Sequence, residues 1–550
     1  MRAFRRMTGC VVVCGLVLGG CGGNGDERAG RTTDATATTA QVNRGGTLVV
    51  GISSDPGGLN PAITTSGATH TAAELMFNGL VELDQAGVPR PELAASWTIG
   101  DNGAIYTFTL QDGVTWHDGK PFTSADVVYS FNEVLTKLHS RTAASVGSNI
   151  SKIEATDPKT VVFRFKEPYA PLLQQLDVTE APILPAHLFQ GTDVMKNPAN
   201  NAPVGTGPFK FVSYTAGSEL RMQRNPAYFK KDLPYLDQVV MRVIPDAGSR
   251  VVALDAGEVD WLFDVPGFDL TRLRADNKFS TLSTQINPGG SNCIMTVGFN
   301  LDRPAFADVQ TRTAIAHALN RKQFVDRVLF GQGRVAEAPI SSGIGFAHAK
   351  DAGLPGFDRA KAAALLDKAG WVREGSGTRT AKGVAGIADG TKLAFDFLFF
   401  PTFSSYGELF KAQLAEVGAE VTLQPLEPSA FSAKVFGDRA FDTNIISYCN
   451  GPDPEIGVRR MLDSARIGPV PFSNAAGYRN PEVDALFAKA ATTVDAKERS
   501  SLYRQIQTRV AKDLPYIWVV ETESTRVFRS GCRNFGPSGH FAETASCDAK

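Results

Sequence analysis

The sequence lacks the features that identify membrane-spanning chains and the common hydrolases. No apolar run among its 550 residues reaches the roughly 18–20 residues that a transmembrane helix needs. It contains neither the G-x-S-x-G motif of serine hydrolases nor the H-E-x-x-H motif of zinc proteases. Its seven histidines are scattered and form no cluster with metal-ligand spacing. We therefore expect a protein that is not an enzyme and that holds no metal and no cofactor.

Two glycine-rich stretches also fail as nucleotide-binding loops. Gly113–Lys120 has five residues between its glycines instead of four, and Pro121 stands where a phosphate loop needs Ser or Thr. Gly331–Ala336 has the spacing of a dinucleotide fingerprint but follows a helical pattern rather than a strand. His117 lies among turn-forming residues of the first stretch. We expect it to stabilise that loop rather than to act as a base or a metal ligand.

The charge balance gives no sign of a nucleic-acid partner. The net charge is −1, and removal of residues 1–20 takes away three arginines and no acid, which changes it to −4. A nucleic-acid surface would need a strong basic excess. The hydrophobic content of 43% is sufficient for two or three cores of ordinary size.

The N-terminus has the pattern of a targeting segment. Arg2, Arg5 and Arg6 precede the apolar stretch Gly9–Leu18, and Leu18-Gly19-Gly20-Cys21 is typical of a bacterial lipoprotein cleavage site. We interpret residues 1–20 as a lipoprotein signal peptide, with ordinary secretion and later cleavage as the alternative.

The residues after this cleavage site are polar and small. Cys21 would carry the lipid, and residues 21–44 contain almost no large apolar side chain, so we expect a flexible tether. The protein would be extracytoplasmic and lipid-anchored, touching the membrane only through the lipid. Such a location permits disulfides. We favour a Cys532–Cys547 pair, whereas Cys293 and Cys449 either pair or remain thiols.

The stretch Glu92–Leu135 carries the clearest local signals. Tyr106–Leu110 alternates large apolar residues with threonines, as a half-buried strand does. Gly and Asn before and after it favour turns. Thr123 and Asp126 have the spacing of a capping box, which predicts the start of a helix.

The same stretch resembles the signature of the family 5 extracellular solute-binding proteins, the dipeptide, oligopeptide and nickel receptors of ABC importers. The matching segments are Ala95-Ser96-Trp97, Tyr106–Leu110, Gly113–Gly119 and Phe122–Ser130. A second motif of the family matches Ala202–Lys210. Similar motifs recur from about Gly46 to Val520.

The resemblance implies an α/β, two-lobed fold of the periplasmic-binding-protein type II kind, with an extra subdomain in the first lobe and a ligand cleft between the lobes. We expect lobe 1 at residues 45–288, with the extra subdomain at about 85–203. Lobe 2 would span residues 289–495. The last segment, residues 496–550, would return to lobe 1 and form a C-terminal tail.

Ligand-binding residues are also implied by the resemblance. The residues expected at the ligand are Ser54, Gly58, Leu59, Asn60, Phe403, Ser404, Ser447, Tyr448, Cys449 and Asn450. In the peptide receptors an Asp that pairs with the ligand's α-ammonium falls at the position of Asn450, and Tyr448 could supply an aromatic wall. A neutral amide cannot neutralise a buried ammonium. A shift of the alignment, with Asp442 or Asp453 in that role, is the alternative.

The sequence therefore predicts a binding protein of an ABC importer that captures a peptide or peptide-like polar solute by lobe closure. Its partners would be a small-molecule or peptide ligand and permease subunits with cytoplasmic ATPases, and we expect a monomer that binds no nucleic acid. Nickel is a minor alternative ligand. The rival functions are a non-transporting sensor or adhesion lipoprotein and a secreted enzyme on the same scaffold.

Overall fold

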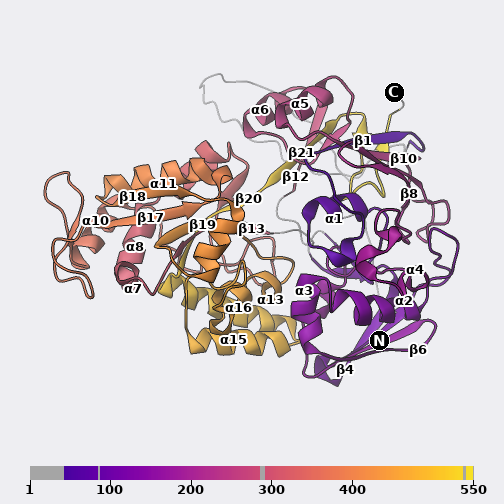
Figure 1. Ribbon diagram of the computed structural model, residues 1–550, viewed down its shortest axis with the longest axis horizontal. Helices are drawn as coiled ribbons and strands as arrows, with labels where there is room; N and C mark the ends of the chain where they lie inside the picture. Colours follow the sequence, from indigo (N-terminus) through magenta and orange to yellow (C-terminus); the bar gives the residue numbers. More distant parts are fainter. Residues whose placement is uncertain (1–42, 85–86, 285–291, 537–539, 549–550) are drawn as a thin grey trace, which may run out of the picture. The chain divides into compact units, whose positions relative to one another are not determined.

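Two large sheets organise the chain in the computed structural model, which describes residues 43–84, 87–284, 292–536 and 540–548 (Figure 1). The first sheet has seven strands in the order β12-β21-β11-β1-β10-β9-β8. Their bounds are β12 Phe279–Thr284, β21 Ser524–Arg529, β11 Trp261–Leu262, β1 Thr47–Ile52, β10 Gln238–Val243, β9 Glu219–Arg224 and β8 Phe209–Thr215. β1 coincides with the largely apolar run of residues 47–52.

Alternating side chains give this sheet two buried faces. Leu48 and Val50 of β1 belong to the large core of the first lobe, while Val49 packs against a smaller core on the opposite face. The smaller core is supplied by α5, Ala247–Asp255, and α6, Gly267–Ala275. The side of the sheet away from α5 and α6 carries α1, Gly67–Ala73 (Figure 1).

A separate four-stranded sheet forms within the segment expected to hold the extra subdomain. Its order is β4-β5-β7-β6, with β4 Ala94–Gly100, β5 Ile105–Leu110, β7 Thr160–Phe165 and β6 Ile150–Asp157. The predicted capping box is confirmed, because the Thr123 N–H donates to Asp126 Oδ2 at 2.9 Å at the start of α2, Ser124–Tyr129.

The second large sheet has six strands in the order β14-β20-β13-β19-β17-β18. Their bounds are β14 Gly333–Val335, β20 Tyr516–Thr522, β13 Cys293–Phe299, β19 Thr443–Cys449, β17 Ala394–Phe399 and β18 Glu420–Pro425. α11, Ser404–Glu416, connects the parallel strands β17 and β18 in a βαβ unit. The chain thus has a two-lobed α/β architecture, with one lobe on each large sheet.

The return to the first sheet comes later than residue 496. α16, Ala496–Asp513, packs its apolar face into the core of the second lobe, and β20 pairs with β13 and β14. The chain re-enters the seven-stranded sheet only at β21, which pairs with β11 and β12. The apolar run at the start of β20 suits either sheet, so local sequence could not identify its partner strand.

The two chain ends of the described part meet on the first lobe. The Asn43 amide donates to Asp548 Oδ1 at 2.8 Å, so residues 43 and 44 belong to the folded body rather than to the expected tether. Near the C-terminus a disulfide joins Cys532 to Cys547, and His540 Nε2 donates to the Phe77 carbonyl at 2.7 Å. Cys21 lies outside the described residues. None of the helices among the described residues combines the length and apolar character needed to cross a bilayer.

Candidate ligand-binding site

Several strands of the seven-stranded sheet end at one common edge. β1 runs parallel to β10 and β11, and β12 has the same direction because β11 and β12 both pair antiparallel with β21. Ligands of open sheets with parallel strands bind outside the carboxyl ends of those strands. The loop after β1, residues 53–60, lies at this edge.

The six-stranded sheet has a corresponding edge. β17 is parallel to β19, and both β19 and β20 pair antiparallel with β13. The carboxyl ends of β17, β19 and β20 therefore lie where β13 begins. The end of β12 and the start of β13 lie at these two edges, and so do the end of β20 and the start of β21. The chain therefore leaves one sheet and enters the other at the same pair of edges twice. The two edges together form the candidate ligand-binding site.

The loop after β1 contains four of the predicted ligand-binding residues, and only two of them are accessible. Ser54 is exposed and Gly58 is half-buried, so both are available to a ligand. Leu59 lies in the core of the first lobe. The Asn60 side chain is also buried, with Oδ1 accepting from the Ala62 N–H at 2.9 Å and Nδ2 donating to Asn200 Oδ1 at 2.8 Å. These bonds fix the loop and leave the Asn60 side chain no free role at a ligand.

The predicted residues after β17 lie at the edge of the second sheet. Phe403 is half-buried and packs against Phe400 and Tyr406, with ring centroids 5.8 and 5.9 Å apart. Ser404 is exposed, and its hydroxyl donates to the Pro401 carbonyl at 2.7 Å. Both positions are open to a ligand approaching the carboxyl end of β17.

The side chains at the end of β19 divide between the two faces of the sheet. Ser447 is half-buried, whereas Tyr448 is fully inside the second core and donates its hydroxyl to the Ser473 carbonyl at 3.0 Å. Tyr448 therefore cannot form the aromatic wall that the sequence suggested. The strand's alternation puts Tyr448 on the core face because its neighbours Ser447 and Cys449 occupy the other one.

Asn450 is held by the protein itself. Its side chain is 1% exposed, its Oδ1 accepts from the Ser341 N–H at 2.8 Å, and its own N–H donates to the Asn292 carbonyl at 3.2 Å. The side-chain oxygen of Asn450, which was expected at the ligand, thus already accepts a hydrogen bond from the protein.

The two acids considered as substitutes are engaged elsewhere. Asp453 is fully buried and accepts two hydrogen bonds from Arg499, at 2.6 and 2.8 Å. Asp442 immediately precedes β19, at the end of that strand away from Cys449, and accepts from the Asp396 N–H at 3.1 Å. Neither carboxylate is placed to receive a ligand's ammonium group at the carboxyl end of β19.

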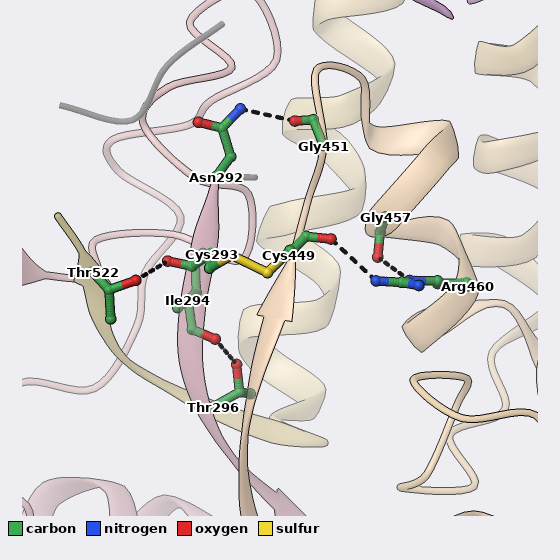
Figure 2. The surroundings of a disulfide bond; sticks show 9 residues. All are labelled: Asn292, Cys293, Ile294, Thr296, Cys449, Gly451, Gly457, Arg460 and Thr522. Carbon is green, nitrogen blue, oxygen red and sulfur yellow. Dashed lines mark hydrogen bonds between the residues drawn. A yellow bond between two sulfur atoms is a disulfide. The ribbon is translucent and has the colours of Figure 1, made fainter. Parts of the chain in front are cut away.

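A disulfide closes this edge of the sheet (Figure 2). Cys293 and Cys449, whose pairing the sequence left open, are directly opposite in the antiparallel ladder and are bonded to each other. Asn292 Nδ2 donates to the Gly451 carbonyl at 2.8 Å beside them. Arg460 donates to the Cys449 carbonyl at 3.2 Å and to the Gly457 carbonyl at 3.3 Å.

One group among the described residues has metal-ligand geometry, away from the two edges. Ligand atoms of Glu92, His540 and Glu543 lie within 4.8 Å of one another. Lys230 Nζ, however, lies 2.6 Å from Glu92 and 3.1 Å from Glu543 and from Glu82. The ammonium group supplies the positive charge there, so the arrangement is an ion-pair network that holds the C-terminal tail to the first lobe.

Two arginines at these edges were missed by sequence reasoning. Arg460 lies next to Arg459 on α14, Arg459–Leu462, and Arg526 lies on β21; neither belongs to a recognisable binding motif. The pairing of β21 with β12 brings Arg526 to the edge of the first sheet, and a hydrogen bond to the Cys449 carbonyl places Arg460 at the end of β19. No signal in the sequence alone could have identified them.

The family model described as bacterial extracellular solute-binding proteins, family 5 Middle, matches residues 88–468. The chain belongs to this family. Its fold and the two facing carboxyl edges agree with that membership.

Relatives of this family 5 protein cover nearly its whole length. It is 28% identical over 526 residues to the oligopeptide-binding protein AppA of Bacillus subtilis, covering 93% of this chain and 92% of the relative. The heme-binding protein A of Haemophilus influenzae is 27% identical, with 92% of each chain covered.

Solved structures show the same fold. AppA of Bacillus subtilis in complex with a nonapeptide superposes with a TM-score of 0.73 at 26% identity, covering 92% of this chain and 100% of that chain. NikA of Brucella suis in complex with Fe(III)-EDTA gives a TM-score of 0.79 at 25% identity with the same coverage. The relatives named here are binding proteins, and this chain is a binding protein of the ABC-importer type.

Proposed function

We propose that this protein captures a peptide or a peptide-like polar solute between its lobes and delivers it to the permease of an ABC importer. The carrying observation is that both chain crossings join the carboxyl edges of the two sheets. A ligand held at both edges would gain contacts only when the lobes approach, because each edge supplies part of the site. The closing of two lobes around a ligand between them is a typical hinge motion of binding proteins.

Ligand binding would then shift the population towards a closed state. Spin labels on exposed positions of the two lobes test this directly, for example at Val252 of α5 and Glu408 of α11. We expect the distance between the labels to shorten and its distribution to narrow when a pool of short peptides is added. A pair within the first lobe, Val252 with the exposed Ser213 of β8, should stay unchanged. A bound peptide that leaves the inter-lobe distance unaltered would contradict lobe closure.

The ligand class is inferred from the relatives and from the end of β19. One relative is named for oligopeptides and another for heme. At the carboxyl end of β19 the amide of Asn450 is engaged, and the nearby Asp453 is paired with Arg499. A free α-ammonium placed there would lack a carboxylate partner, which is costly in a closed site. We propose a ligand without a free α-ammonium at that point, such as a blocked or modified peptide.

We further propose that Cys21 anchors the protein to the outer face of the cytoplasmic membrane or in the periplasm, as a monomer that acts beside its permease. The support is the charged, apolar and small-residue pattern of residues 1–21. Replacing Cys21 with Ala should abolish acylation and release the protein from membranes. Unchanged membrane association and an unchanged mass would refute the anchor.

A further inference from the structure

Arg526 is half-buried, and it differs from the other arginines of the described residues that have little solvent exposure because neither an acid nor a carbonyl pairs with it. Arg250, Arg379 and Arg499 pair with carboxylates, and Arg312 and Arg321 donate to backbone carbonyls. Arg526 makes no ion pair and no hydrogen bond within the described part of the chain, and its Nη1 is shielded from solvent without an acceptor. Shielding a charged N–H donor from water without an acceptor costs free energy of folding. Folding alone therefore does not explain an arginine at this position.

Aromatic rings hold this guanidinium in place. Its carbon lies 5.7 Å from the ring centroid of Trp261 and 5.4 Å from that of Phe263, both next to it on the same face of the sheet. Cation–π contacts of this kind orient a guanidinium without using its N–H donors. Burial lowers the pKa of Arg526 to about 10, and the charge of Glu74 opposes that shift only in part. The side chain is therefore a positive, oriented donor at neutral pH.

Glu74, the acid whose charge acts on Arg526, is in contact with a histidine. Glu74 Oε1 lies 3.2 Å from His70 Nδ1. Although burial acts in the other direction, the hydrogen bond and charge of Glu74 raise the pKa of His70. Glu74 is thus in contact with His70, whereas no hydrogen bond or ion pair among the described residues joins it to Arg526.

The position of Arg526 places it at the candidate ligand-binding site. It is the third residue of β21, just after the crossing from the second lobe, in register with Leu282 near the end of β12. On the opposite edge, Arg460 also lacks a carboxylate partner among the described residues and stacks on Phe472 at 5.7 Å. Each edge therefore presents one guanidinium that no acid of the described chain neutralises.

From this geometry we infer that Arg526 binds an oxyanion of the transported ligand, a carboxylate or a phosphate, through its free N–H donors. A planar guanidinium matches such groups with two parallel hydrogen bonds, which a lysine ammonium cannot reproduce. This inference rests on the proposed binding function and adds to it the charge that the ligand must carry.

Calorimetry with three matched sets of N-acetylated tetrapeptides tests the inference: a free C-terminal carboxylate, a C-terminal amide, and an amide carrying phosphoserine. The mature wild-type protein should prefer one of the anionic sets, which also distinguishes carboxylate from phosphate. Arg526→Gln should weaken binding of that set by about 30-fold or more. Arg526→Lys should restore it only in part.

Arg221→Gln is the matched control, since Arg221 is an exposed arginine on β9 of the same sheet, paired with Glu219. It removes the same charge and should leave binding within about twofold, as expected for a screened surface residue. Binding that is equally tight for the amide set, or unaffected by Arg526→Gln, overturns the inference while leaving the binding function intact. Failure of the wild-type protein to bind any set contradicts the proposed function, and the inference falls with it.

Discussion

Cys293 and Cys449 face each other across the ladder between β13 and β19 and are joined by a disulfide at the point where the chain enters the second lobe. The bond spans 156 residues of sequence, whereas the bond between Cys532 and Cys547 spans 15. Both therefore restrict the unfolded chain, but the first restricts a much longer loop.

The loop lengths predict different effects of removing each bond. In the chain-entropy model, Cys293→Ser with Cys449→Ser should cost about 5 kcal/mol, and Cys532→Ser with Cys547→Ser about 3 kcal/mol. Urea unfolding of the two double variants measures this, and non-reducing peptide mapping verifies both links in the wild type. Free thiols at either pair, or unfolding midpoints equal to that of the wild type, would contradict the assignment.

His117 joins two motifs of the first lobe. Its Nε2 donates to the Gly207 carbonyl at 3.0 Å, and its Nδ1 accepts from the Gly205 N–H at 3.2 Å, so the ring must be neutral. Burial lowers the pKa of His117 to about 4, while the unfolded chain titrates near 6.5. Between these values the unfolded state binds a proton that the folded state does not.

The stability contributed by His117 is therefore present above pH 6.5 and lost as the pH falls towards 4, by about 3 kcal/mol in all. The slope of unfolding free energy against pH in this window should decrease in His117→Gln. It should not vanish, because burial also lowers the pKa of His139, to about 3. An identical slope in the wild type and the variant would show that His117 is not buried as a neutral ring.

Gly205 allows two chain segments to touch. A β-carbon at this position would lie 1.7 Å from the Met76 carbonyl oxygen, and the backbone rather than a flexible side chain would have to move. We predict that Gly205→Ala lowers the free energy of unfolding by about 3 kcal/mol or more. Gly345→Ala is the control, because a β-carbon there meets no atom within 4 Å. Equal stability of both variants would refute the close approach.

The state of Asn450 predicts a preference among peptides. Calorimetry with matched free and N-acetylated di- to tetrapeptides should show tighter binding of the acetylated forms, because Asn450 carries no charge and the carboxylate of Asp453 is paired with Arg499. Differences of several kcal/mol are common when a buried charge loses its partner. Tight binding of the free peptides that acetylation abolishes would mean that another acid fulfils this role.

Local sequence patterns predicted individual helices and strands well, but they did not predict which elements and side chains contact one another. Alternation and turn residues were sufficient for β5, and the capping box fixed the start of α2, because each depends on neighbouring residues. The bond between Asn450 and Ser341 joins residues 109 apart, and β20 could have paired with either sheet. Such features depend on tertiary contacts that no local pattern encodes, which is why Tyr448 was expected at the ligand.

Native mass spectrometry of the freshly purified mature protein, before and after incubation with a pool of short free and blocked peptides, tests the central claim most directly. The account predicts one ligand per chain that is released unchanged when the protein unfolds. The absence of any bound species in both samples would contradict a binding protein. Release of a chemically altered molecule would instead indicate an enzyme on this scaffold.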